Sequence, residues 1–148
     1  MWAVIENARL DVEHLGIGFD SLESEPPNVQ AKLLQLGAAD LADLTARQEL
    51  IIKGSNLPSI DAREGLSKGL VRSFYDGLQD VTLGWFEAED SSRVQYLLAE
   101  HFARFSEEVP SYKEVALSLV DRDKDFRERV LLGAEGQPLY GEIKAKEA

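Results

Sequence analysis

The sequence contains no cysteine and only two histidines among its 148 residues. The lack of cysteine excludes disulfide bonds, thiolate catalysis, and zinc or iron–sulfur sites with cysteine ligands. Each histidine directly follows a glutamate, in Glu13-His14 and in Glu100-His101. Adjacent residues on a helix point about 100° apart, so neither pair fits the Glu-x-x-His pattern of helical metal sites. We therefore predict neither a metal site nor a cofactor.

Long apolar segments are also lacking. Apolar clusters such as residues 130–132 are far shorter than the ~20 residues that a membrane-spanning helix needs. The first residues include no basic stretch, and Glu6 interrupts their apolar run, which is not the pattern of a secretory signal. We expect a cytoplasmic protein that does not bind membranes.

Basic residues are few. Lysine and arginine number 16 against 27 aspartates and glutamates, which gives a formal net charge of −11. Residues 1–50 are the most acidic part of the chain. Such a chain is repelled by phosphate backbones and anionic lipid surfaces. We therefore expect no nucleic-acid partner, and a protein partner with basic character fits the charge better.

Signatures of catalysis are missing as well. The chain has no Walker A loop, no Gly-x-Ser-x-Gly elbow and no His-Glu-x-x-His pair. Residues 16–21 lack the third glycine of a dinucleotide-binding turn. Residues 121–132 begin with alternating aspartates, but Phe126 stands where a calcium loop requires glycine. We predict no catalytic residue.

The composition is that of a globular protein. The hydrophobic fraction is 44% and the charged fraction is 29%. A chain of this length buries roughly 68–70% of its unfolded surface, which is enough for one core without disulfides. We predict a single, mainly helical domain over residues 1–148, built as a compact array of about five helices. Residues 1–18 fit a helix or a strand, and the glycine- and proline-containing residues 133–148 predict an irregular tail.

A long helix over about residues 60–86 is the predicted centre of this array. Apolar residues recur there at spacings of three or four, which is the pattern of one buried helix face. These residues are Leu66, Leu70, Phe74, Leu78, Val81 and Trp85. Further helices are predicted over residues 28–36, 39–53, 93–108 and 111–132. The last has a possible break near Asp121, after which a strand is an alternative.

The same central segment carries small residues at intervals of four: Gly65, Gly69, Ser73 and Gly77. Glycine inside a helix costs roughly 1 kcal/mol relative to alanine, so a line of glycines indicates close approach of another backbone. Two interpretations stay open. The stripe can pack against a neighbouring helix of the same chain, or it can form a self-association surface that makes a homo-oligomer.

Aromatic and acidic residues gather near the end of the predicted central helix. They are Tyr75, Trp85, Phe86, Glu87, Glu89 and Asp90. One interpretation is a solvated helix end. The other is a contact surface, because tryptophan and tyrosine are over-represented among the residues that dominate interface energy.

Three classes of function follow from these patterns. The first is a non-enzymatic acidic module for protein–protein interaction, such as an adaptor, an inhibitor or an immunity-type protein. The second is a small enzyme that uses carboxylates or a divalent metal, which would need a deep pocket lined by acids with shifted pKa values. The third is a carrier of a small apolar ligand in a cavity between helices. The missing catalytic signatures favour the first.

Overall fold

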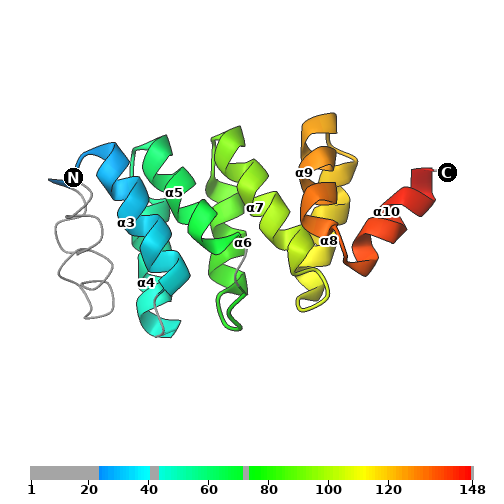
Figure 1. Cartoon of the computed structure of the whole chain (residues 1–148), viewed down its shortest axis with the longest axis horizontal. Helices are drawn as coiled ribbons and strands as arrows, with labels where there is room; N and C mark the ends of the chain where they lie inside the picture. The colour runs from blue at the N-terminus through cyan, green and yellow to red at the C-terminus, as the bar shows by residue number, and fades with distance from the viewer. Residues whose placement is uncertain (1–23, 41–43, 72–73, 148) are drawn as a thin grey trace. The chain divides into compact units, whose positions relative to one another are not determined.

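The computed structural model describes residues 24–40, 44–71 and 74–147. This part of the chain forms helices and contains no strand, so the predicted mainly helical class is confirmed (Figure 1). Its eight helices are α3 (Pro27–Asp40), α4 (Leu44–Ser55), α5 (Ile60–Leu70), α6 (Gln79–Ala88), α7 (Ser92–Arg104), α8 (Pro110–Val120), α9 (Lys124–Ala134) and α10 (Pro138–Glu147). The count of about five helices is therefore wrong. Residues 1–18, with the choice between helix and strand, lie outside the described residues.

The chain divides into two compact units, Met1–Ser91 and Ser92–Ala148. The assignment of residues 1–148 to a single domain stays a prediction. Over the described ranges, no helix combines the length and the apolar character that crossing a membrane requires.

In the first unit, α3 and α5 lie side by side at very short range (Figure 1). A Cβ atom on Gly65 would overlap the backbone of Ala31, and one on Gly69 would lie 2.8 Å from the Cβ atom of Ala38. Glycine is the residue that permits this approach. Helix α4 contacts both α3 and α5, and it also contacts α6. The buried side chains of this unit include Leu33, Leu34, Leu50, Ile51, Leu57, Leu66 and Leu70.

The predicted central helix over residues 60–86 is wrong, because the structure places two helices there. Helix α5 ends at Leu70, and α6 begins at Gln79. Gly77 has a φ of 105°, which a right-handed helix cannot contain. The Gln79 side chain accepts a hydrogen bond from the Gly77 N–H at 2.6 Å and donates one to Asp76 at 2.9 Å, which fixes this turn.

The apolar stripe of the predicted helix is thus shared by two helices and their connection. Leu66, Leu70, Leu78 and Trp85 are buried, while Phe74 and Val81 are half-buried. The spacing of three and four persists on both sides of the turn, so periodicity alone does not reveal the break.

Other predicted boundaries also shift. Gly37 lies inside α3 instead of ending it, and the second predicted helix, over residues 39–53, begins only at Leu44. The break predicted near Asp121 is present, and a helix follows it instead of a strand. The Asp123 carboxylate starts that helix by accepting a hydrogen bond from the Phe126 N–H at 2.9 Å.

In the second unit, α7 and α9 approach each other as closely as α3 and α5 do. A Cβ atom on Gly133 would overlap the carbonyl oxygen of Glu100. The core of this unit is formed by Val94, Leu98, Phe102, Tyr112, Ala116, Phe126 and Val130, all of which are buried.

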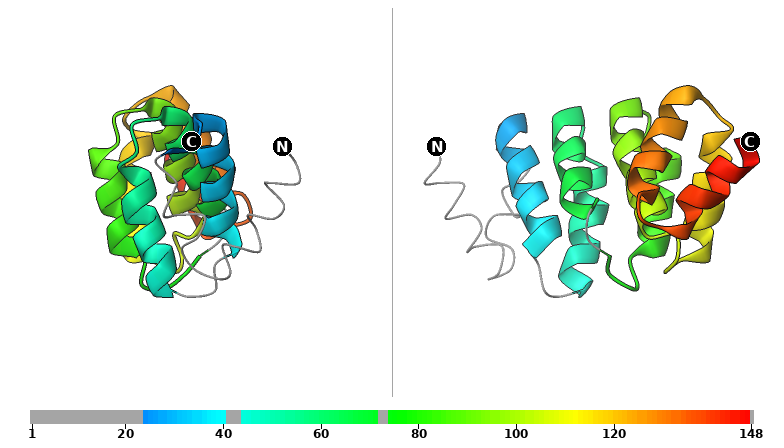
Figure 2. Two further views of the ribbon diagram at one scale, coloured as in Figure 1. Left: turned by 90° about the vertical axis from the view of Figure 1, so that its left-hand side faces the viewer. Right: turned by 45° about the vertical axis from the view of Figure 1, so that its right-hand side comes forward.

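The irregular tail predicted over residues 133–148 is wrong, because most of it is helical. Helix α10 covers residues 138–147 and contacts α8 and α9 (Figure 2). Leu139 and Ile143 are buried. Of the residues that suggested irregular structure, Gly136 has a φ of 78° before the helix, and Pro138 occupies the first helical position, where proline is tolerated. Gly141 lies inside α10, where it is accommodated without ending the helix.

Candidate docking cleft

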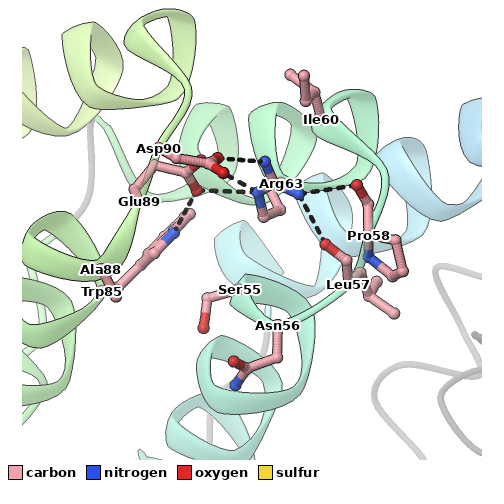
Figure 3. Close-up of a pocket in the computed structure, with 10 residues that line it drawn as sticks. All are labelled: Ser55, Asn56, Leu57, Pro58, Ile60, Arg63, Trp85, Ala88, Glu89 and Asp90. Atoms are coloured by element: carbon pink, nitrogen blue, oxygen red, sulfur yellow. Dashed lines mark hydrogen bonds and ion pairs between the residues drawn. The ribbon is translucent and has the colours of Figure 1, made fainter.

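A cleft of about 470 Å³ lies in the first unit, where the end of α4, the start of α5 and the end of α6 come together (Figure 3). We call it the Arg63 cleft. It is lined by Ser55, Asn56, Leu57, Pro58, Ile60, Arg63, Trp85, Ala88, Glu89 and Asp90. Three of the residues singled out in the sequence are among these: Trp85, Glu89 and Asp90.

Arg63 and Glu89 form a buried ion pair at the centre of the cleft. The Arg63 Nε atom lies 3.0 Å from Glu89 Oε1 and 3.2 Å from Oε2. The side chains are 10% and 1% exposed. Arg63 Nη1 donates to the carbonyl oxygens of Leu57 at 2.8 Å and of Pro58 at 3.0 Å (Figure 3). The first turn of α5 is thereby tied to the loop that precedes it.

The carboxylate of Glu89 is held on both of its oxygens. The Trp85 indole N–H donates to Oε1 at 3.0 Å, and the backbone N–H of Ser91 donates to Oε2 at 3.0 Å. Burial acts to raise the pKa of Glu89. The hydrogen bonds from Arg63, Ser91 and Trp85, together with the positive charge of Arg63, outweigh burial and hold this pKa below its ordinary value. Glu89 is therefore ionised at neutral pH.

The rim of the cleft is more exposed than its centre. The Asp90 side chain is 92% exposed, with one oxygen 3.4 Å from Arg63 Nη2. Ile60 is 43% exposed, and Pro58 and Ala88 are exposed as well. A carboxylate and an apolar surface therefore face solvent at the same opening.

The residues of the predicted contact surface differ widely in exposure. Trp85 and Phe86 are buried, so neither protrudes as an anchor. Tyr75 is half-buried, and the buried Arg47 guanidinium lies 3.3 Å from the centroid of its ring. Glu87 is exposed and does not line the cleft. Glu87 and Asp90 are therefore at the surface, whereas Glu89 is buried together with Trp85 and Phe86.

Arg63 is the central residue of this cleft, and sequence reasoning missed it. It lies 26 positions before Glu89, and no local pattern connects the two. A weak signal existed, because Arg63 stands three positions before Leu66 and seven before Leu70, which places it beside the predicted apolar face of the helix. A charged residue close to a predicted buried face needs a partner.

The small-residue stripe also divides. Gly65 and Gly69 face α3 within the same unit, as described above, whereas Gly77 lies in the turn before α6. Ser73 lies outside the described residues. The two helical glycines are consequently covered by α3.

The second unit also contains a buried acidic side chain, but its arginine partners are more exposed than Arg63. In the second unit, Glu100 lies 3.2 Å from Arg104 Nη2 and 3.4 Å from Arg129 Nη1. His101 is buried against the rings of Phe102 and Phe105. The described residues include no group of three or more histidines, aspartates or glutamates placed to hold a metal ion. His14 falls outside them.

No protein-family model matches the sequence, and neither a curated protein nor a solved structure is similar to it. Function is therefore inferred from the chemistry of the Arg63 cleft. An ionised carboxylate that already accepts hydrogen bonds on both oxygens is poorly placed to exchange protons with a substrate. What the cleft offers to another molecule is its shape, its exposed apolar rim and the outward-facing charge of Asp90.

Proposed function

We propose that this chain is a non-enzymatic protein-interaction module that binds a partner protein at the Arg63 cleft. The observation that carries the proposal is the contrast between centre and rim. Arg63 and Trp85 both donate hydrogen bonds to Glu89, while Ile60 and Asp90 present apolar surface and charge to solvent. A floor whose polar groups are bonded within the chain suits docking at an amphipathic rim, because binding then requires little reorganisation.

The charge of the chain supports a basic partner. The formal net charge is −11, and the charged residues that line the cleft are one arginine against two acids. A negative field of this kind speeds encounter with a positively charged protein and weakens with rising salt. We therefore expect electrostatic steering of the partner toward the chain.

The two alternatives receive less support from the same cleft. An enzyme working through carboxylates needs an acid or base whose pKa lies near the working pH, whereas that of Glu89 is lowered. A carrier of an apolar ligand needs a largely apolar cavity. The Arg63 cleft instead has an ion pair at its centre.

The test is affinity capture with the full chain as bait, comparing wild type with Asp90→Lys and with Ile60→Ser. A matched control is Glu114→Lys, which makes the same kind of charge change at an exposed position on α8. Circular dichroism confirms that each bait is folded. We expect at least one protein that is retained by wild type and by Glu114→Lys, and lost with both cleft variants.

The captured protein is then purified and titrated by calorimetry at low and high ionic strength. Binding that weakens with salt and is lost in Asp90→Lys supports the proposal. If every captured protein binds the cleft variants as well as wild type, the Arg63 cleft is not the interaction surface. Turnover of a substrate by the purified chain would show that it is an enzyme.

A further inference from the structure

We infer that the Arg63 cleft receives a single lysine or arginine side chain of the partner, with its aliphatic stem on Ile60 and Pro58 and its cationic head at Asp90. This inference rests on the proposed function and names the chemistry of the occupant. The exposed apolar surface and the exposed carboxylate lie at the same opening. A long basic side chain is the common protein group that combines an apolar stem with a positive end.

The charges inside the cleft disfavour an anionic occupant. Each nitrogen of the Arg63 guanidinium already donates a hydrogen bond within the chain: Nε to Glu89, Nη1 to two backbone carbonyls and Nη2 to Asp90. A guanidinium has five N–H donors, so little capacity is left for a phosphate or a carboxylate. An incoming anion would meet two carboxylates and a positive charge that is already compensated.

Asp90 retains capacity for a cation. Its contact with Arg63 Nη2 is 3.4 Å long, at the outer limit of a hydrogen bond, and its side chain is 92% exposed. Glu89 cannot serve in this way, because its side chain is 1% exposed and both of its oxygens accept bonds. The partner's cation therefore pairs with Asp90 at the rim and not with the ion pair at the centre.

The probes are four acetylated pentapeptide amides, identical except for a central arginine, lysine, norleucine or glutamate flanked by alanines. Norleucine has the stem without the charge. Binding is followed on the full chain by nitrogen–proton correlation spectra, which report the backbone amides of Ile60 and Asp90. The indole N–H of Trp85 is a further reporter; the chain has two tryptophans, and Trp85→Phe assigns the signal.

We expect the arginine and lysine peptides to shift these resonances in a saturable manner, the norleucine peptide to bind more weakly and the glutamate peptide not to bind. Asp90→Asn should lower the affinity for the arginine peptide about two- to fivefold, which is the range for a solvent-exposed ion pair. The affinity for the norleucine peptide should not change. Ile60→Ser should lower the affinity for both the arginine and the norleucine peptide. Glu87→Gln is the matched control, because Glu87 is an exposed acid outside the cleft lining, and it should change neither.

The inference is overturned if the glutamate peptide binds as well as the arginine peptide, if Asp90→Asn has no effect, or if the arginine peptide does not bind. In these cases the proposed function still stands, provided that capture of the partner depends on Asp90 and Ile60. Conversely, the arginine peptide can bind as expected while capture of every protein is unaffected by the cleft variants. In that case the proposed function fails and the cation site remains, so failure of the inference can be distinguished from failure of the proposed function.

Discussion

The two units of the chain use glycine in the same way and charge in different ways. In the first unit, Gly65 and Gly69 let α5 lie against the backbone of α3, and in the second Gly133 lets α9 lie against α7. Close helix crossings are therefore a shared element of the architecture. They do not distinguish one unit from the other, and they do not point to a binding function.

The buried charges do distinguish the units. Arg63 and Glu89 are 10% and 1% exposed, and they form the centre of a cleft. Glu100 is similarly buried at 9%, but its partners Arg104 and Arg129 are 32% and 41% exposed. The first pair is sealed between helices and a loop, whereas the arginines of the second reach solvent. The ion pair of the first unit is therefore more strongly desolvated than that of the second.

The largest expected effect is the loss of the first ion pair. Glu89→Gln keeps an oxygen acceptor for Trp85 but leaves the Arg63 charge buried without its main counterion. We expect the free energy of unfolding of the first unit to fall by about 3 kcal/mol. Glu100→Gln should cost only about 1 kcal/mol, because the arginines left behind are hydrated. The measurement is denaturant unfolding followed by amide hydrogen exchange resolved by helix.

A second variant separates charge from packing. The double substitution Arg63→Met with Glu89→Gln removes both charges and should restore much of the stability lost in Glu89→Gln alone. Equal losses for Glu89→Gln and Glu100→Gln would break the distinction between the two units.

An intermediate effect is expected at the helix crossings. Gly65→Ala and Gly133→Ala should each lower the free energy of unfolding by about 1–3 kcal/mol, because the new Cβ atom overlaps backbone that cannot move without separating the helices. The loss opposes a gain of about 1 kcal/mol in helix propensity. Thermal unfolding with helix-resolved hydrogen exchange measures the net change in stability of each variant.

The matched control is Gly84→Ala in α6, since an added Cβ atom there meets nothing within 4 Å. This variant should be stabilised by about 0.5–1 kcal/mol. A stabilised Gly65→Ala beside a destabilised Gly133→Ala would show that the two crossings are not equivalent.

The smallest effect is expected in mild acid. The pKa of Glu89 is held below its ordinary value near 4.5, so its ionisation stabilises the fold above that pH, and this stability is lost as pH falls through the lowered pKa. Because the pKa is lowered, the carboxylate keeps its charge to a lower pH than an ordinary glutamate, and the loss stays smaller than that in Glu89→Gln while this charge persists. Unfolding of wild type and Glu89→Gln is compared from about pH 5 to about pH 3. If the free energy of unfolding depends on pH equally in both proteins, ionisation of Glu89 is not the source of the acid sensitivity.

Much of the secondary structure is readable from local patterns. The apolar spacing around Leu66 and Trp85 predicts helices that bury these residues, and both are buried in helices. The same spacing wrongly predicted one continuous helix, because apolar spacing carries no information about the positive φ of Gly77. It also gave no reason to expect α10, where Leu139 and Ile143 are too few to form a clear pattern and are buried only by contact with other helices.

The candidate cleft was only partly predictable. The acids near the end of α6 attracted attention as a group, and Glu89 and Asp90 do line the cleft. Local pattern does not reveal that Glu89 turns inward to Arg63 while Asp90 faces solvent. Adjacent residues at a helix end point in different directions, and which of them meets a partner depends on where α5 lies.

The helical class, the negative charge and many of the buried residues can be read from the amino-acid sequence, because these properties depend on composition and on short-range periodicity. The pairing of Arg63 with Glu89, the packing of Gly65 and Gly69 against α3, and the exposure of Ile60 beside Asp90 depend on how the helices pack. Each of these joins residues that are distant or unrelated along the chain. Such contacts exist only once the helices are packed, and local pattern carries no information about them.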